Sequence, residues 1–185
     1  MTCIVGVADE SGVWIGGDSA ACVGYQTRAT RLSKVFAVTT TARERFLVGY
    51  TSSFRMGQLL QYRLDLTTPC SGDPLRYMVT TFVEAVRTLF KGAGFATVDN
   101  SQESGGSFLV GFRGQLYNVD RDYQVNHMAD GYDATGCGDE YALGALAMLD
   151  GLEPEGRLQK ALEVAAHFSG KVRPPFVVEH LPNEA

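Results

Sequence analysis

Residues 2–18 have the sequence TCIVGVADESGVWIGGD, and this stretch decides the fold. An apolar run over residues 3–8 is followed by Glu10-Ser11-Gly12, a tripeptide typical of a turn. A second apolar run over residues 13–17 then ends at Asp18. Two short apolar runs on either side of a turn predict a β-hairpin.

The remaining pattern alternates between strands and helices. In the first half it predicts strands over 34–39 and 46–50, a helix from Ser53 and a helix from Asp73-Pro74 to Lys91. A loop over 92–106 and a hairpin over 107–112 and 115–119 follow. The last part is predicted to contain a turn over 133–139 that leads into a helix to Leu149, a helix over 156–169 and a strand over 176–181. This order predicts an α+β fold with helices outside packed antiparallel sheets. Because no internal repeat or linker interrupts it, residues 1–185 are predicted to form a single domain.

The composition bounds the function classes. The 185 residues are 45% hydrophobic and carry a formal net charge of −5, with Lys and Arg scattered, so neither nucleic acid nor an anionic membrane surface is an expected partner. No segment resembles a signal peptide or a spanning helix, which predicts a cytoplasmic protein with reduced cysteines. The four Cys and three His stand in no metal-ligand spacing, and we expect neither a metal nor another cofactor.

Thr2 has the position of an N-terminal nucleophile. A hydroxyl is a poor nucleophile at neutral pH, but a threonine at the N-terminus can use its own amine as the base. The unperturbed pKa of that amine is about 8, far better suited to accept a proton in the cytoplasm than a lysine near 10.4. Only Met1 precedes Thr2, and a small second residue permits removal of the initiator methionine. Taken alone, a threonine at position 2 is better explained as a residue that merely starts a strand.

The residues around Thr2 favour the chemical interpretation. The motifs TCIVGV (2–7) and GVWIGGD (12–18) resemble the opening strands of proteasome β subunits and HslV. In that family an aspartate after the second strand pairs with a lysine that begins the third, and Asp18 and Lys34 match this pattern. Physically, a buried Lys34 cation would favour the deprotonated amine and hydroxyl of Thr2, and Asp18 would hold that cation in place.

Further motifs match the family with two departures. Gly49 in VGYT resembles the glycine whose amide forms the oxyanion hole. The run ATGCG (134–138), followed by a helix, is similar to the family's glycine-flanked serine turn, but Cys137 replaces the serine that helps to hold the N-terminal amine. Ser169 fits a second family serine, whereas Ala166 occupies the place of the aspartate three residues before it, and aligning to HslV instead places His167 opposite an acidic residue.

The resemblance implies the four-layer αββα sandwich of N-terminal nucleophile hydrolases. It also implies a threonine-type endopeptidase subunit of a self-compartmentalising ring protease, acting on unfolded polypeptide or peptides. Homo-oligomeric rings and an ATP-dependent unfoldase partner are further expectations. By family position Ala21, Leu32 and Leu47 would line the substrate pocket, which predicts a preference for hydrophobic residues before the scissile bond.

Two alternatives remain open at the level of sequence. The changes at Cys137 and Ala166 are compatible with a non-catalytic ring component or scaffold protein. An N-terminal nucleophile amidase for a small molecule would keep the sandwich but require an open pocket and no ring. A Cys3 nucleophile for such an amidase would require a further cleavage after Thr2, and its place in an apolar run predicts a buried thiol instead.

Overall fold

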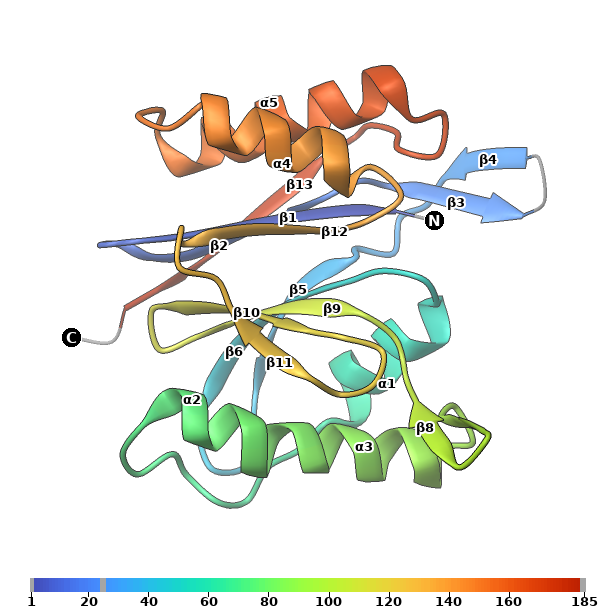
Figure 1. The fold of residues 1–185 in the computed structure, drawn as a ribbon, viewed down its shortest axis with the longest axis vertical. Coiled ribbons are helices and arrows are strands. Elements are labelled where there is room, and N and C mark those ends of the chain that lie inside the picture. Colours follow the sequence, from blue (N-terminus) through green and yellow to red (C-terminus); the bar gives the residue numbers. More distant parts are fainter. Residues whose placement is uncertain (1, 24–25, 184–185) are drawn as a thin grey trace.

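The N-terminal hairpin is present as β1 (Cys3–Asp9) and β2 (Gly12–Gly17) in the computed structural model of the chain, which describes residues 2–23 and 26–183. On either side of the hairpin, β12 (Tyr132–Gly136) pairs with β1, and β13 (Val177–Pro182) pairs with β2. The resulting antiparallel sheet has the order β12-β1-β2-β13. It brings residues from both ends of the sequence next to one another (Figure 1).

A second antiparallel sheet faces the first. Its strands are β5 (Val35–Thr39), β6 (Arg45–Tyr50), β9 (Phe108–Phe112), β10 (Gln115–Val119) and β11 (Val125–His127), in the order β11-β10-β9-β6-β5. Successive side chains of a strand point to opposite faces. Phe46 and Val48 of β6 therefore pack toward the helices, whereas Leu47 packs between the two sheets.

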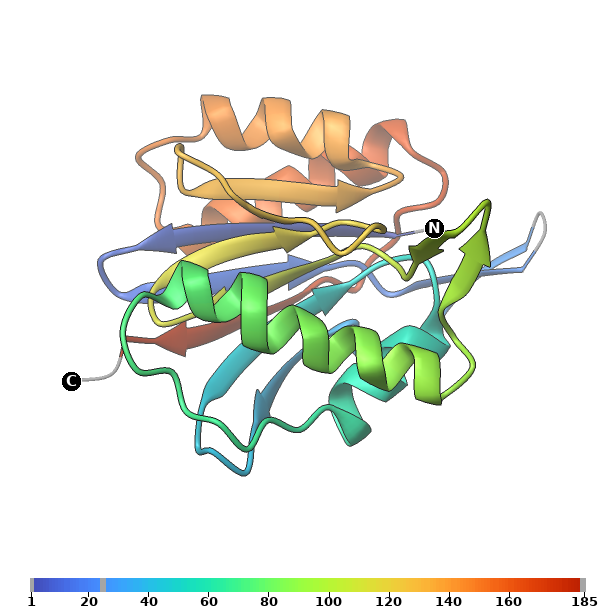
Figure 2. The same cartoon turned by 60° about the horizontal axis from the view of Figure 1, so that its bottom comes forward.

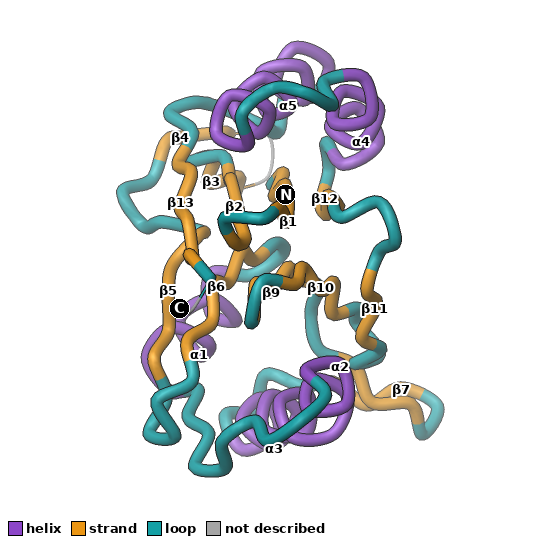
Figure 3. Tube along the Cα trace, turned by 90° about the vertical axis from the view of Figure 1, so that its left-hand side faces the viewer, coloured by secondary structure: helices purple, strands orange, loops and turns teal. Residues whose placement is uncertain are grey.

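Helices lie on the outer face of each sheet (Figures 1 and 3). Helices α4 (Asp139–Met148) and α5 (Pro154–Phe168) cover the first sheet; α1 (Phe54–Arg63), α2 (Pro74–Tyr77), the π-helical segment η1 (Met78–Phe82) and α3 (Val83–Gly92) lie against the second. As expected, Ser53 caps α1, since its hydroxyl accepts a hydrogen bond from Arg55 N–H at 3.2 Å. In the described part of the chain, no helix is long and apolar enough to cross a membrane.

Three apolar clusters fill the spaces between these elements. One joins α1, η1 and α3 to the second sheet, one joins α4 and α5 to the first, and the third lies between the sheets. The third cluster consists of fully or nearly buried aliphatic residues: Ile4, Val13, Ile15, Val35, Leu47, Leu109, Leu116 and Leu181. The predicted α+β class is confirmed.

Several predicted boundaries were wrong. Among the described residues, six strands, not four, precede the first helix, because β3 (Ala20–Val23) and β4 (Gln26–Ala29) form a ribbon that projects from the body of the molecule (Figure 2). The stretch 92–106, predicted as a loop, contains a second ribbon formed by β7 (Thr97–Asp99) and β8 (Gln102–Ser104). The residues of β4, β7 and β8 are exposed or half-buried, so these strands lack the buried periodicity by which strands are recognised. The turn predicted over 133–139 is mostly strand β12.

Helix α1 depends on a glycine for its approach to the second sheet. A Cβ added to Gly57 would lie 2.2 Å from two carbons of the Tyr50 ring. We therefore expect Gly57→Ala to lower the free energy of unfolding by about 1–3 kcal/mol through overpacking. Gly144→Ala in α4 is the matched control, since a Cβ there meets no atom within 4 Å, and it should raise stability by up to about 1 kcal/mol. Urea denaturation of both variants tests this, and equal stabilities would contradict the close packing.

Candidate functional site

Thr2, Asp18 and Lys34 lie together in the interior. Thr2 precedes β1, Asp18 follows β2 and Lys34 precedes β5, so pairing of β1 with β2 and packing of the two sheets bring the three side chains together. Lys34 Nζ donates hydrogen bonds to Thr2 Oγ1 at 2.7 Å and to Asp18 Oδ1 at 2.9 Å. None of the three residues is more than 3% exposed. The lysine thus links the hydroxyl and the carboxylate.

The Asp18 carboxylate is held by the backbone as well as by Lys34. Cys3 N–H donates to Oδ1 at 3.1 Å, and Ala20 N–H and Arg173 N–H donate to Oδ2 at 2.8 and 3.3 Å. A buried ion pair is tolerated only where further hydrogen bonds satisfy its charges. These donors meet that requirement, and they tie β1, the segment after β2 and the segment before β13 to one carboxylate.

The turn after β12 fixes the backbone of Thr2. Cys137 N–H donates to Thr2 C=O at 2.7 Å. Gly136 has a φ of 113°, and a Cβ there would lie 2.0 Å from the same carbonyl oxygen. Only glycine permits this conformation and this approach, which gives a structural reason for the first glycine of ATGCG.

The two residues expected to support Thr2 through side chains are placed differently. Cys137 is exposed, and no hydrogen bond of its thiol to another described residue is recorded. Ser169 caps the C-terminus of α5 and bonds through its backbone to Ala165 and Val172; within residues 2–23 and 26–183, no hydrogen bond joins its hydroxyl to Thr2. Of these two residues, Cys137 contacts Thr2, and it does so through its backbone N–H.

The geometry does not support Gly49 as an oxyanion donor. Gly49 lies inside β6, opposite Val35 on one side and Leu109 on the other. The neighbouring bonds Tyr50 N–H to Lys34 C=O and Thr51 N–H to Ser107 C=O fix the alternation of the ladder, which directs Gly49 N–H toward β9. A Cβ at Gly49 would lie 2.6 Å from methyl groups of Ile4 and Ile15. Gly49 is thus small because the sheets pack closely there.

A cavity of about 60 Å³ beside Thr2 is bounded by the segment after β6. Its other lining residues are Lys34, Tyr50, Thr51, Ser52, Ser53 and Phe54. Ser52 adopts a left-handed conformation with a φ of 68°, and Ser53 N–H donates to Thr51 C=O at 2.8 Å. No acceptor for Ser52 N–H is recorded in the described part of the chain. This turn was not among the predicted site residues, although three consecutive hydroxyl residues between a strand and a helix were a usable signal.

The predicted substrate-pocket residues do not line this cavity. Leu47 is 1% exposed and packs between the sheets, so it cannot contact a substrate; its assignment is corrected because the strand alternation turns it into the core. Ala21 lies opposite Arg28 in the β3–β4 ribbon, and Leu32 is 52% exposed just after that ribbon. Tyr50 and Phe54 supply the apolar wall instead.

The other candidate groups and cavities are less suited to catalysis. Burial raises the pKa of the Cys3 thiol to about 12, and the nearby Asp18 charge adds to the effect, so Cys3 remains a protonated thiol at neutral pH. A larger cavity of about 610 Å³, lined by Glu44, Arg113 and Asn183 among others, contains none of the residues around Thr2. Among the described residues, no group of three or more His, Cys, Asp or Glu is arranged to hold a metal ion.

Comparison with solved structures identifies similar folds. BPH from Thiobacillus denitrificans superposes with a TM-score of 0.78 at 18% identity over 98% of each chain. The same protein in complex with epoxomicin gives 0.79 at 19% identity over 99% of this chain and 100% of that one. HslV from Trypanosoma brucei gives 0.68 at 19% identity over 98% of this chain and 99% of that one.

Anbu, an ancestral β-subunit from Yersinia bercovieri, gives a TM-score of 0.71 at 14% identity over 97% of this chain and 81% of that one. No family model and no curated protein sequence matches the chain. At these identities the likeness establishes a shared α+β fold with BPH, HslV and Anbu.

The Lys34–Asp18 pair can be tested without any assay of activity. Lys34→Met and Asp18→Asn each leave a buried polar group without its charged partner, so each should lower the free energy of unfolding by about 3–5 kcal/mol. The double variant should lose less than the sum of the two, because neither charge is then stranded. Denaturant titration of the four proteins measures the coupling, and strict additivity would argue against a direct ion pair.

Proposed function

We propose that the chain is a threonine peptidase of the N-terminal nucleophile type, folded as one domain over residues 1–185 with the four-layer αββα architecture. The observation that carries the proposal is the hydrogen bond of 2.7 Å from buried Lys34 Nζ to Thr2 Oγ1. A cation at this distance stabilises negative charge on the hydroxyl oxygen as it attacks a carbonyl. Asp18, 2.9 Å from the same nitrogen, keeps that cation oriented.

The proposed reaction requires removal of Met1, which lies outside the described residues. The freed Thr2 amine then accepts the hydroxyl proton while Oγ1 bonds to the substrate carbonyl carbon. The amine passes this proton to the leaving nitrogen as the peptide C–N bond breaks, which leaves an ester on Thr2. Water, activated by the same amine, adds to the ester and releases the acid product.

Ser52 N–H replaces Gly49 N–H as our candidate oxyanion donor. It belongs to the turn that lines the cavity beside Thr2, and no described residue accepts a hydrogen bond from it. A preorganised backbone donor near the developing charge is the usual means of stabilising a tetrahedral intermediate. The left-handed conformation of Ser52 supports this role, since strained backbone often persists where a functional constraint holds it.

We further propose that substrates are unfolded polypeptides or peptides and that the protein works in the cytoplasm as a homo-oligomeric ring, with an ATP-dependent unfoldase as its partner. The likeness to HslV and Anbu structures supports a ring subunit. Epoxomicin, the ligand named in one of the similar BPH structures, is an expected inhibitor.

One competing function has support in specific residues. Cys137 exposes its thiol where the resemblance implies a serine, and the side chain of Ala166 packs with the α4–α5 cluster where it implies a carboxylate. A non-catalytic ring component would tolerate both changes. The buried Thr2–Lys34–Asp18 arrangement favours catalysis, because an ion pair that served only the fold would not need to hold its cation 2.7 Å from the Thr2 hydroxyl oxygen.

The peptidase proposal predicts a specific pattern of mass and activity. Intact mass spectrometry of the protein made in a cytoplasm should show loss of Met1, and the processed protein should cleave a fluorogenic peptide. Thr2→Ala should lower kcat/KM at least about 10³-fold, whereas Thr2→Ser should retain measurable cleavage. Thr88→Ala, an exposed threonine on α3, is the control and should be fully active. A processed wild type without turnover would support the non-catalytic ring component.

Phe54 should set the size of the side chain accepted before the scissile bond. The cavity of about 60 Å³ fits a small apolar group, and half-buried Phe54 forms one wall. Phe54→Ala should therefore raise the ratio of kcat/KM for a leucine substrate to that for an alanine substrate by roughly 10-fold, equivalent to one or two buried methylenes. Tyr62→Ala, 73% exposed on the same helix, should leave the ratio unchanged. An unaltered ratio in Phe54→Ala would remove Phe54 from the substrate pocket.

A further inference from the structure

Four exposed cations lie on the two segments that adjoin Asp18 through backbone hydrogen bonds: Arg28 and Arg31 in and after the β3–β4 ribbon, and Lys171 and Arg173 before β13, here called the basic rim. Backbone hydrogen bonds connect the segments that carry them to the site. Arg173 N–H donates to Asp18 Oδ2, Ser19 N–H donates to Arg173 C=O at 3.0 Å, and Thr30 N–H donates to Ser19 C=O at 2.9 Å. The β3–β4 ribbon and the segment before β13 therefore adjoin the buried Asp18 directly.

The basic rim has a charge opposite to that of the whole chain. The protein has 21 Asp and Glu against 16 Lys and Arg, yet residues 19–34 and 170–176 contain no acidic residue at all. The acidic side chain that borders them, Asp18, is buried and paired with Lys34. A local excess of exposed cations on a negatively charged protein produces a positive potential confined to one region of its surface.

Like most arginines in the described part of the chain, the rim cations are not neutralised by a carboxylate. Arg87, Arg113 and Arg157 each form a salt bridge with a carboxylate. By contrast, no carboxylate within residues 2–23 and 26–183 lies within salt-bridge distance of a rim cation. The contacts of the rim guanidinium groups are neutral: Arg173 Nη1 donates to Thr27 C=O at 3.1 Å, and Arg28 Nη2 donates to Gln26 Oε1 at 3.2 Å.

We propose that the basic rim binds acidic stretches of a polypeptide and that substrates rich in Asp and Glu are captured preferentially at the Thr2 site. This inference rests on the proposed peptidase function. Guanidinium groups bind carboxylates through paired hydrogen bonds, and exposed cations raise the rate at which an anionic chain reaches the site. The small cavity selects the substrate residue before the scissile bond, whereas the rim selects acidic residues farther along the substrate.

Two peptides with one cleavable sequence test the proposal, one flanked by Glu and the other by Gln. At low salt, wild type should cleave the Glu peptide with a kcat/KM about three- to tenfold higher, and about 0.5 M NaCl should remove most of the difference. Arg28→Gln with Arg31→Gln removes two of the four rim charges, so it should lower the preference by about half or more and leave cleavage of the Gln peptide unchanged. A preference that this double change leaves undiminished, or none in wild type, would overturn the proposal.

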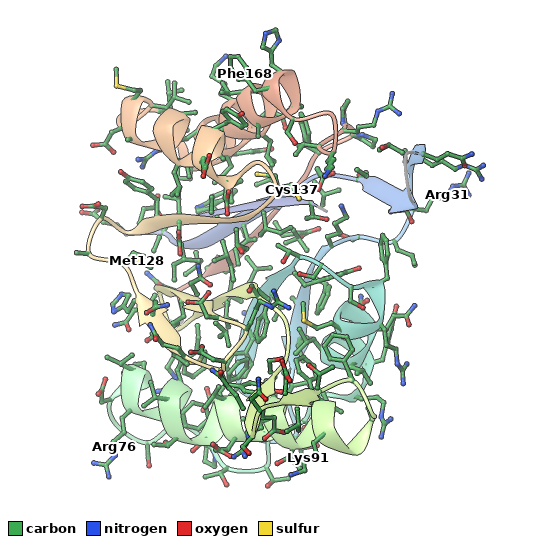
Figure 4. All side chains as sticks on the ribbon, turned by 45° about the vertical axis from the view of Figure 1, so that its right-hand side comes forward. Arg31, Arg76, Lys91, Met128, Cys137 and Phe168 are labelled. Atoms are coloured by element: carbon green, nitrogen blue, oxygen red, sulfur yellow. The ribbon has the colours of Figure 1, made fainter. Side chains whose placement is uncertain are left out.

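The matched control removes two charges at the opposite helical layer. Figure 4 shows Arg31 in the same half of the molecule as Cys137, whereas Arg76 on α2 and Lys91 on α3 lie in the opposite half. Arg76→Gln with Lys91→Gln changes the net charge equally and should keep the preference for the Glu peptide. Loss of the preference in this control would show that the preference depends on overall charge, and it would overturn the proposed role of the basic rim.

Binding to Thr2→Ala separates the rim from the peptidase proposal. Fluorescence anisotropy of both labelled peptides should show tighter binding of the Glu peptide, dependent on Arg28 and Arg31. If this binding is present but no protein cleaves either peptide, the rim stands and the proposed function fails. If wild type cleaves both equally and Thr2→Ala binds both equally, the proposed function stands and the rim fails.

Discussion

The buried ion pair between Lys34 and Asp18 is the interaction on which the rest of the structure depends. Two charges removed from water are stable only if each finds partners that replace its hydration. Asp18 obtains them from Lys34 and from three backbone N–H groups that belong to separate segments of the chain. Those segments must therefore be in place before the pair is stable, which couples the Thr2 site to the assembly of the first sheet.

Close packing of the two sheets imposes a second constraint. Glycines stand where a side chain of one sheet presses on the backbone of the other: Gly6 meets Leu116, and Gly49 meets Ile4 and Ile15. A larger residue would separate the sheets and withdraw Lys34, which comes from the second, from Thr2, which comes from the first. Glycine in these strands thus serves the geometry of the site through packing, even where it makes no contact with the site itself.

The sequence predicted the elements whose burial leaves a pattern. The hairpin of β1 and β2, the strands β5 and β6, and Thr2, Asp18 and Lys34 at their ends follow from apolar runs and a family resemblance. The two exposed ribbons were not predicted, because strands of exposed polar residues lack this pattern of burial. Gly49 and Leu47 were misassigned because a resemblance that matches a strand does not fix which of its residues reaches the end of the ladder. The structure fixes this through the register of β6 against β9.

The departure at Cys137 bears on whether Thr2 is still held correctly. A serine hydroxyl is a stronger hydrogen-bond donor and acceptor than a thiol, so the side chain here is the weaker support. Yet the bond recorded to Thr2 comes from the Cys137 backbone, and its close approach is permitted by Gly136 rather than by the residue at 137. Replacement of a serine by cysteine leaves both features intact. The position of Thr2 then depends on Lys34 and on the backbone of the turn after β12.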